Sequence, residues 1–466
     1  MSPLSRFVLV ANRLPVRWDE ETSEWQVSPG GLVSALTPVL RERDGVWVGW
    51  TGIADFQPAP FDEGGIHLHP VPVHAAEVEP YYHGFCNGTL WPLYHNAIRS
   101  PEFHRHWWWP YHYVNRRFAD VAAKRLAPEG VCWVQDYQMQ LVPAMLREHR
   151  PGATIGFFLH IPFPPVELFA YLPWRHAVIE GLLGSDVVAF QTRQSLENFA
   201  DAARMFGGAE RHGDVLRHEG RRIRLQASPI SIDTEKFERL AADPEVERMS
   251  ADIRSDVGPG RKIVLGVDRL DYTKGIGIRL KAVQTFFQAA RDMGRLERGR
   301  EPVLIQLSVP SREEVSEYAL MREEVEGLVG RINGELGRPG WTPITYMYRQ
   351  LAQPELVAYY RAADVMLVTP LADGMNLVAK EYVATRLDDT GTLVLSEFAG
   401  AAAELEKALL VNPMDVDGLA HRLLDALALS PVEQRGRMAT MRRAVRENDV
   451  FAWSRRCLEA LEEEAG

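Results

Sequence analysis

The chain lacks most of the features that would place it outside the ordinary globular class. Its 466 residues include only three cysteines, Cys86, Cys132 and Cys457, and an odd number at these spacings supports neither a disulfide framework nor a cysteine-based metal site. No apolar run approaches the roughly 20 residues that a membrane-spanning helix needs. The apolar run Phe7–Ala11 is far too short for a signal peptide. We therefore expect a cytoplasmic protein.

Basic residues are also fewer than acidic residues. The chain has 63 acidic and 52 basic residues, a formal net charge of −11. This balance argues against nucleic acid or an anionic membrane as the main partner. If the substrates are anionic, local cations must hold them against the overall field. The sequence leaves open whether the protein is a monomer or a homo-oligomer.

The familiar cofactor and hydrolase motifs are missing. The sequence has no G-x-x-x-x-G-K-[ST], no H-E-x-x-H and no G-x-S-x-G. Gly275-Ile276-Gly277 lacks the third glycine of a dinucleotide fingerprint, because Leu280 stands at that position. His67 and His69 alternate on one strand face, but no third ligand follows at a metal-binding spacing. We expect neither a metal site nor a cofactor.

The sequence does contain two runs of alternating strand and helix patterns. The first begins with the strand pattern Arg6–Asn12, and the second begins after Pro229. The chain is also too long for a single core. These patterns predict an α/β fold with two Rossmann-like, doubly wound domains facing a cleft. The predicted boundaries are 1–232 and 233–450, with a C-terminal helix at 451–466 that folds back toward the N-terminal domain.

One strand-to-helix turn carries two cations. Lys262–Val267 has the pattern of a buried strand and Ile278–Ala290 that of a helix, so Arg269 and Lys274 fall in the turn between them. This turn follows the carboxyl end of the predicted strand, and ligands of open α/β sheets bind at the carboxyl ends of strands. A guanidinium fork and an ammonium suit a phosphate or diphosphate, although two solvated surface cations would give the same pattern.

A second loop leads from the strand pattern Val365–Thr369 into a helix starting near Asn376. Backbone N–H groups from Gly374 onward lie at the positive end of this helix and suit an anion. Asp373 suits the hydroxyls of a sugar, and Glu381 suits a ribose diol. A capped helix with ordinary ion pairs is the plainer alternative.

The N-terminal half repeats these features. Gly30-Gly31 precedes the helical pattern Leu32–Leu40, where the backbone can approach an anion or make an ordinary turn. Another helix is predicted over Met139–His149. Polar residues also follow three strand patterns: Arg13, Asp136 and His160.

Several long motifs make the chain resemble the trehalose-6-phosphate synthases, retaining GT-B glycosyltransferases of family GT20. The similarity runs over nearly the whole length. The motifs are Ala11-Asn12-Arg13-Leu14-Pro15, Pro29-Gly30-Gly31-Leu32, Trp47-Val48-Gly49-Trp50, Tyr81-Tyr82, Leu90-Trp91-Pro92, Val134-Gln135-Asp136-Tyr137, Gly156 to Pro164, Asp268 to Gly275, Asp373 to Glu381 and Ser396 to Ala401.

The resemblance implies transfer of glucose from a nucleoside-diphosphate glucose (NDP-glucose) to glucose 6-phosphate. The product is α,α-trehalose 6-phosphate, which belongs to trehalose biosynthesis. NDP-glucose is then a co-substrate, and no metal takes part. The family is thought to work by front-face attack, with the leaving diphosphate helping to deprotonate the acceptor hydroxyl.

The resemblance also implies roles for individual residues. Residues matching acceptor contacts are Arg13, Tyr82, Trp91, Asp136 and Arg312. Residues matching donor contacts are Gly30, Gly31, His160, Arg269, Lys274, Leu351, Asp373, Gly374, Met375, Asn376, Leu377, Val378, Ala379, Lys380 and Glu381. Four of these, Arg269, Lys274, His160 and Asp373, are the expected catalytic residues.

Two departures from the family pattern leave the nucleotide base open. The loop Met347–Leu351, where the family contacts the base, differs from that of UDP-glucose-using bacterial members, and Ala372 replaces a frequent arginine. The donor is therefore UDP-, GDP- or ADP-glucose. Two other functions stay open: a transferase like glucosylglycerol-phosphate synthase, and a non-catalytic sugar-phosphate sensor.

Overall fold

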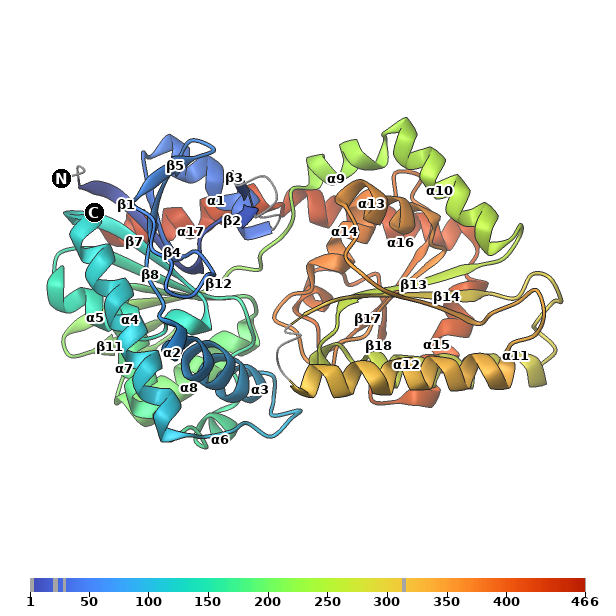
Figure 1. Cartoon of the computed structure of the whole chain (residues 1–466), viewed down its shortest axis with the longest axis horizontal. Helices are drawn as coiled ribbons and strands as arrows, with labels where there is room; N and C mark the ends of the chain where they lie inside the picture. Colours follow the sequence, from blue (N-terminus) through green and yellow to red (C-terminus); the bar gives the residue numbers. More distant parts are fainter. Residues whose placement is uncertain (1–3, 20–23, 28–30, 312–315, 466) are drawn as a thin grey trace. The chain divides into compact units, whose positions relative to one another are not determined.

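The chain forms two compact units, each with its own parallel sheet and covering helices (Figure 1). The computed structural model describes residues 4–19, 24–27, 31–311 and 316–465. Unit 1 comprises Met1–Ile230 and Val450–Gly466, and unit 2 comprises Ser231–Asp449. The alternation of strands and helices confirms the predicted α/β class.

Unit 1 is built on a ten-stranded sheet. Its strands run parallel from β12 to β6, and the antiparallel strands β10, β11 and β5 extend its two edges. In spatial order the strands are β10 (Glu210–His212), β11 (Val215–His218), β12 (Arg221–Ala227), β9 (Val187–Phe190), β8 (Thr154–Leu159), β7 (Leu126–Gln135), β1 (Ser5–Arg13), β4 (Val46–Trp50), β6 (Ile66–Pro70) and β5 (Phe61–Glu63).

Helices cover this sheet, and its central strands are buried. Every residue of β8 is buried, as expected for a parallel strand between two helical layers. A separate hairpin, β2 (Val16–Asp19) and β3 (Glu24–Val27), pairs Trp18 with Trp25. The helices are α1 (Gly31–Glu42), α2 (Ala75–Glu77), η1 (Val78–Leu90), α3 (Trp91–Tyr94), α4 (Arg105–Arg125), η2 (Tyr137–Met139), α5 (Val142–His149), α6 (Val166–Phe169), α7 (Arg175–Leu183), α8 (Arg193–Gly207) and α17 (Val450–Ala465).

The C-terminal helix α17 is part of unit 1. It packs against α1 and the strands β7, β8 and β9. Trp453 is fully buried there, with its ring centroid 5.4 Å from that of Trp133 and 5.1 Å from that of Phe158. The last turns of the chain thus complete the core under the first sheet.

Unit 2 is built on a six-stranded sheet in which all strands are parallel. The spatial order is β15 (Ile344–Tyr348), β14 (Val303–Val309), β13 (Ile263–Arg269), β16 (Val365–Val368), β17 (Thr392–Ser396) and β18 (Leu409–Val411). The helices are α9 (Thr234–Ala241), α10 (Pro244–Val257), η3 (Tyr272–Lys274), α11 (Ile276–Asp292), α12 (Ser316–Leu336), α13 (Gln353–Ala362), α14 (Leu377–Thr385), η4 (Gly400–Ala403), α15 (Val416–Ala428) and α16 (Pro431–Glu447).

In both sheets the order of the parallel strands reverses once, and this reversal marks where a ligand is expected to bind. In unit 2 the chain proceeds from β13 outward to β15 and then returns to β16, so the switch point lies between β13 and β16. In unit 1 it lies between β1 and β7. Ligands of open α/β sheets bind outside the carboxyl ends of the strands at such points. Arg13, Asp136, Arg269 and Asp373 all lie at or just after the ends of these strands.

Among the boundaries that differ from the predictions, two have a clear physical cause. Strand β13 continues through Arg269, which pairs with Val309, so Arg269 ends the strand and does not lie in the turn. The predicted helix Met139–His149 is divided, because α5 begins only at Val142, with Pro143 in its first turn. Proline lacks an N–H group, so it is favoured in the first turn of a helix, whereas further inside a helix it removes a hydrogen bond.

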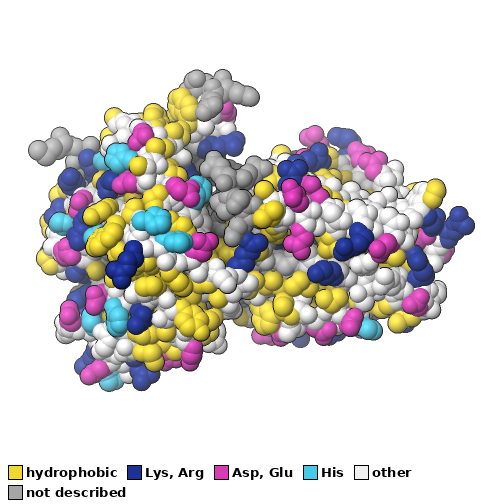
Figure 2. All heavy atoms as spheres, turned by 60° about the horizontal axis from the view of Figure 1, so that its bottom comes forward, with side chains coloured by type: hydrophobic (Ala, Val, Ile, Leu, Met, Phe, Trp, Pro, Cys, Tyr) yellow, Lys and Arg dark blue, Asp and Glu magenta, His cyan; other side chains and the backbone are white. Residues whose placement is uncertain are grey.

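Acidic and basic side chains are interspersed on the faces of both units seen in Figure 2, with no extended field of one sign. Among the described helices, none is both long and apolar enough to cross a membrane.

Candidate active site

An ion pair joins the two loops at the switch point of unit 2. Lys274 Nζ lies 2.5 Å from Oδ2 of Asp373, and both side chains are largely buried. Lys274 ends the short helix η3 after β13, and Asp373 lies in the loop between β16 and α14. Two residues 99 positions apart, predicted separately as donor contacts, are thus in direct contact.

Backbone contacts fix this pair of loops. Leu371 N–H donates to the carbonyl of Thr273 at 2.7 Å, and the Asp271 carboxylate accepts from the Thr273 N–H at 2.9 Å. Gly275 has φ +66°, and a Cβ there would lie 2.7 Å from the carbonyl oxygen of Thr369. Only glycine combines this backbone conformation with so close an approach.

The fully buried Arg279 lies beneath the loops. Its guanidinium forms an ion pair with Asp268 and donates to Gln306 at 3.0 Å and to Thr369 Oγ1 at 2.8 Å. It also donates to the carbonyl of Lys274 at 3.4 Å. One side chain from α11 therefore joins the carboxyl ends of β13 and β16 and the middle of β14 to the Lys274 loop.

The start of α14 is preorganised for an anion. Asn376 takes φ +77°, its Oδ1 accepts from the Ala379 N–H at 3.2 Å, and its Nδ2 donates to Asp373 at 3.1 Å. A Cβ at Gly400 would lie 2.0 Å from the carbonyl oxygen of Gly374, so that glycine allows the neighbouring loop to brace this one. The N–H groups of the first turn of α14, which starts at Leu377, lie at its positive end.

Further along α14, two charged side chains are held by partners within unit 2. Lys380 is buried, and its Nζ lies 2.5 Å from Glu404. Tyr360 donates its hydroxyl to Glu381 at 2.8 Å, and burial raises the pKa of the Glu381 carboxyl. Leu351, the predicted contact to the base, is half-buried just before α13.

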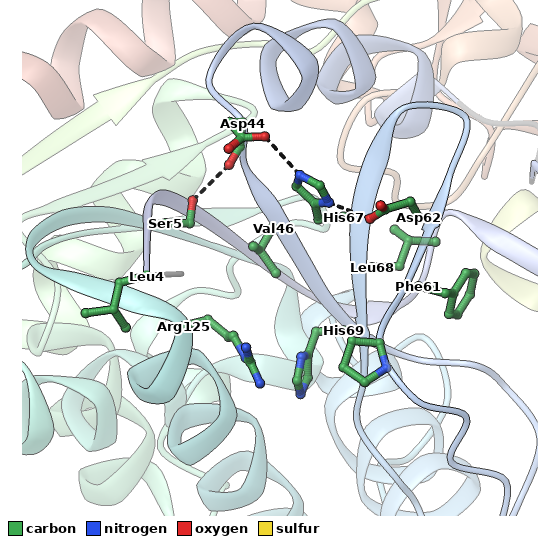
Figure 3. A pocket seen from close by; sticks show the side chains of 11 residues that line it. Leu4, Ser5, Asp44, Val46, Phe61, Asp62, His67, Leu68, His69 and Arg125 are labelled. Atoms are coloured by element: carbon green, nitrogen blue, oxygen red, sulfur yellow. Dashed lines mark hydrogen bonds and ion pairs between the residues drawn. The ribbon is translucent and has the colours of Figure 1, made fainter. Parts of the chain in front are cut away.

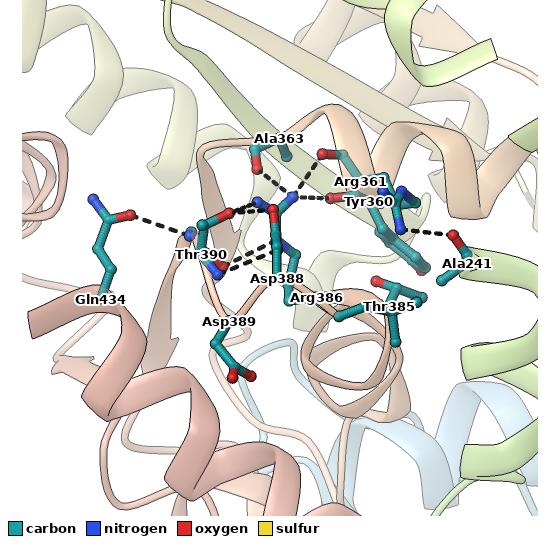
Figure 4. Close-up of polar contacts among 12 residues, drawn as sticks. Ala241, Tyr360, Arg361, Ala363, Thr385, Arg386, Asp388, Asp389, Thr390 and Gln434 are labelled. Carbon is teal, nitrogen blue, oxygen red and sulfur yellow. Dashed lines mark hydrogen bonds and ion pairs between the residues drawn. The ribbon is translucent and has the colours of Figure 1, made fainter. Parts of the chain in front are cut away.

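The far end of α14 is held by Arg386 (Figure 4). Its guanidinium donates to the carbonyls of Arg361 at 2.6 Å and Ala363 at 3.1 Å, at the end of α13, and its Nε donates to the carbonyl of Thr390 at 3.0 Å. Carbonyls at a helix C-terminus lack partners within the helix. Arg386 supplies those partners, and α14 is fixed at both ends.

In unit 1, Arg13 is presented by aromatic rings at the end of β1. The carbon of its guanidinium lies 4.1 Å from the ring centroid of Trp50 and 5.4 Å from that of Tyr82. A Cβ at Gly52 would lie 1.6 Å from the Arg13 guanidinium. The rings orient the cation without neutralising it, so its donors stay available to an anion.

Asp136 follows β7 in a strained conformation. It has φ 73° and ψ 170°, a region that is essentially restricted to glycine and costs about 1–3 kcal/mol. Its carboxylate accepts from the backbone N–H of His160 at 3.1 Å, and burial raises its pKa to about 6. Strain of this kind is retained where the surrounding structure enforces it, often at functional sites.

His160 is held as a neutral imidazole. Its Nε2 lies 2.9 Å from Gln135 Oε1, and its Nδ1 lies 3.4 Å from Nε2 of Gln191, whose Oε1 accepts from the Ile230 N–H. These partners assign the proton to Nε2. Burial lowers the pKa of His160 to about 3. A contact from this ring to a sugar therefore requires exchange of one of the two hydrogen bonds.

The other predicted site residues are distributed as follows. Trp91 is buried, with its ring 5.8 Å from that of Tyr137, the neighbour of Asp136. Gly31 begins α1, whereas Gly30 and Arg312 lie outside the described residues. In the described part of the chain, no three His, Cys, Asp or Glu side chains are grouped to hold a metal ion.

Sequence reasoning missed the residues that support the site from below. Arg279 and Arg386 are buried arginines inside or after helices. Gln135 ends β7, and Gln191 directly follows β9. Each acts through partners distant in sequence, so no local pattern marks it. A charged residue in a helix otherwise facing the core would have been the available signal for Arg279.

Comparison with known proteins assigns the family. The family model for glycosyltransferase family 20 matches residues 5–463. The trehalose-6-phosphate synthase of Mycolicibacterium smegmatis is 50% identical over 474 residues, covering 99% of this chain and 93% of the relative. The chain belongs to glycosyltransferase family 20.

Solved structures of family 20 enzymes match both units. An α,α-trehalose-phosphate synthase (UDP-forming) from Burkholderia xenovorans, in complex with glucose-6-phosphate, is 33% identical with a TM-score of 0.88, covering 98% of this chain and 100% of that one. An E. coli protein bound with UDP-2-fluoro glucose is 32% identical with a TM-score of 0.89, covering 98% of each chain. The fold is GT-B, as predicted.

The raised pKa of Asp136 in this family 20 chain has a testable consequence. A carboxyl whose pKa is higher in the folded than in the unfolded state, about 6 against roughly 4, loses folded-state stability as pH rises through that window. Asp136→Asn removes this loss. We expect its stability relative to wild type to increase from pH 4.5 to pH 7, measured by urea denaturation. The control is Asp201→Asn, at an exposed position of α8. We expect its stability relative to wild type to change less between pH 4.5 and pH 7. A constant difference at Asp136 would contradict the raised pKa.

Proposed function

We propose that this protein transfers glucose from an NDP-glucose to glucose 6-phosphate and forms α,α-trehalose 6-phosphate with retention at the anomeric carbon. The contact between Lys274 and Asp373 at the switch point of unit 2 carries the proposal. Family membership and the names of the relatives support it.

The donor would bind to unit 2. Cleavage of the anomeric C–O bond develops negative charge on the leaving diphosphate, and fixed cations stabilise that charge more in the transition state than in the ground state. Arg269 at the end of β13, Lys274 and the N-terminus of α14 provide such charges. Glu381 lies further along α14, where a ribose diol could donate to it.

The Lys274–Asp373 pair suggests how donor binding proceeds. A diphosphate would attract Lys274 away from Asp373, and the freed carboxylate oxygen would accept from hydroxyls of the glucose. Asn376 already donates to the same oxygen at 3.1 Å and would keep Asp373 oriented during the exchange. The pair thus holds both side chains near the geometry that the donor requires.

The acceptor would bind to unit 1. Arg13, oriented by Trp50 and Tyr82, would hold the phosphate of glucose 6-phosphate. Asp136, strained at the end of β7, would accept from a hydroxyl of the acceptor sugar.

Retention would follow from attack on the face that the diphosphate leaves. The acceptor oxygen bonds to the anomeric carbon as the bond to the diphosphate breaks, and the acceptor proton passes to the departing diphosphate. This route uses no carboxylate nucleophile, and we assign none. We propose no role for a cofactor or a metal.

Nucleotide release tests the function directly. UDP-, GDP- and ADP-glucose are each incubated with glucose 6-phosphate and, separately, with glycerol 3-phosphate. We expect acceptor-dependent release with glucose 6-phosphate and at least one donor, which also identifies the base. Release only with glycerol 3-phosphate would indicate the glucosylglycerol-phosphate reaction. Release no faster than hydrolysis with every pair would contradict an enzymatic function.

Arg13→Ala tests the acceptor site. Loss of a charge-assisted contact to the phosphate should raise the KM for glucose 6-phosphate by about 10-fold or more, with a smaller effect on kcat. Steady-state kinetics with varied acceptor gives both constants. Arg17→Ala, four residues further along the chain and exposed on β2, is the matched control. An unaltered acceptor KM would remove Arg13 from the phosphate site.

A further inference from the structure

Unit 1 contains a cavity at the end of its sheet opposite to Arg13 and Asp136 (Figure 3). The cavity has a volume of about 380 Å³ and lies near the amino ends of β1 and β4, beside β6 and the end of α4. Its polar lining comes from His67, His69, Arg125, Asp44 and Asp62. None of these residues takes part in the proposed transfer reaction.

Arg125 presents hydrogen-bond donors without an acceptor. Its Nε is buried and has no hydrogen-bond partner, and no ion pair joins its guanidinium to a carboxylate within the described ranges. Beside it, His69 is half-buried and likewise makes no ion pair with a described carboxylate. Leaving buried donors unsatisfied is costly, so such an arrangement suits an acceptor that arrives from outside.

The electrostatics of His69 agree with this geometry. Burial, together with the smaller effect of the positive charges of Arg125 and Lys124, lowers its pKa to about 4. The imidazole is therefore neutral near pH 7 and offers one N–H donor without a competing charge. An anion placed between His69 and Arg125 would relieve the field that these cations impose.

The two carboxylates that line the cavity are already paired. His67 Nε2 lies 2.9 Å from Asp44 Oδ1, and His67 Nδ1 contacts Asp62. Both contacts raise the pKa of His67. Figure 3 shows both carboxylates turned toward His67, while the side chains of His69 and Arg125 lie together away from them. When His67 is protonated, the group formed by His67, Asp44 and Asp62 carries one net negative charge, whereas it carries two when His67 is neutral.

We propose that this cavity binds a small organic anion, with its carboxylate or phosphate group on Arg125 and His69 and its apolar part against Val46, Phe61 and Leu68. The guanidinium fork matches either anionic group, and the apolar lining excludes a fully hydrated inorganic ion as the best ligand. Strand β1 has nine residues, from Ser5 at this cavity to Arg13 at its other end, and spans about 26 Å of extended chain. The site is therefore distinct from the proposed acceptor site, and it does not depend on the proposed function.

Calorimetric titration with simple probes tests the site. Phenyl phosphate and benzoate are titrated into the full-length protein, with benzyl alcohol as the uncharged control. We expect saturable binding of at least one anion, and Arg125→Gln should weaken it by about 10-fold or more, the scale of a charge-assisted hydrogen bond. Lys124→Gln removes the same charge from the adjacent, exposed residue and should change Kd by less than about two-fold.

A second measurement locates the bound probe. In protein labelled with ¹⁵N-histidine, the imidazole signal of His69, assigned with His69→Gln, should shift on titration in wild type and in Lys124→Gln, and in Arg125→Gln only at about 10-fold higher probe concentration. Because phenyl phosphate could also bind to the proposed substrate sites, binding that Arg125→Gln leaves unchanged overturns the proposal. Absence of saturable binding by both anions, or equal weakening by both substitutions, overturns it as well.

Discussion

Lys274→Ala should lower kcat by about 10²-fold or more, the scale of losing one contact to charge that develops in the transition state. Lys274 lies at the switch point of unit 2, where it is largely buried and held 2.5 Å from Asp373. Low exposure to water strengthens its effect on a nearby diphosphate. Steady-state kinetics with the preferred NDP-glucose at saturating glucose 6-phosphate measures the change.

The matched control for this prediction is Lys281→Ala. Lys281 is exposed on α11, seven residues further along the chain, so the substitution removes the same charge at a distance from the switch point. We expect kcat within about two-fold of wild type for this control. If Lys274→Ala raises only the KM for the donor and leaves kcat unchanged, Lys274 binds the ground state and does not stabilise the leaving group.

Arg279→Leu should destabilise unit 2 by about 3–5 kcal/mol, the cost of leaving one partner of a buried ion pair uncompensated. The Arg279 side chain is inaccessible to water, as is almost all of Asp268. The same substitution removes the hydrogen bonds to Gln306 and Thr369 Oγ1. Urea denaturation followed by tryptophan fluorescence and circular dichroism measures the loss.

Two further variants separate the ion pair from simple loss of packing. Arg291→Leu, at an exposed position of the same helix, should change the free energy of unfolding by less than about 0.5 kcal/mol. The double variant Asp268→Leu/Arg279→Leu should be more stable than Arg279→Leu alone, because no buried charge remains unpaired. If Arg279→Leu unfolds at the same urea concentration as wild type, Arg279 does not hold the loops together.

Much of the fold could be predicted because its central strands are buried on both faces. Strands β1, β13 and β16 match the predicted strands Arg6–Asn12, Lys262–Val267 and Val365–Thr369 to within one or two residues at each end, since a short apolar run between polar segments permits few alternatives. Element boundaries were predicted wrongly where strand pairing or a proline sets the end of the element. Arg269 belongs to β13 because it pairs with Val309, and α5 begins late because Pro143 occupies its first turn.

The candidate site divides in the same way. The sequence pointed to Lys274, Asp373 and Arg13, because a cation that follows a strand suits an anion and a carboxylate there suits a hydroxyl. This inference needs no knowledge of tertiary contacts. The sequence did not reveal the strain at Asp136 or the two glutamine partners of His160, because these features depend on contacts between segments far apart in the chain.

The sequence by itself determined the α/β class, the family and the chemical types of residue at the strand ends, because side-chain periodicity and local chemistry are written along the chain. Only the tertiary structure decided which of these residues meet. It paired Lys274 with Asp373, placed Arg279 beneath their loops, and left Arg125 and His69 without a carboxylate partner among the described residues. The contact between Lys274 and Asp373 joins residues 99 positions apart. Burial sets the strength of such a contact and the protonation of the groups that form it. Neither the separation nor the burial can be read from a local pattern.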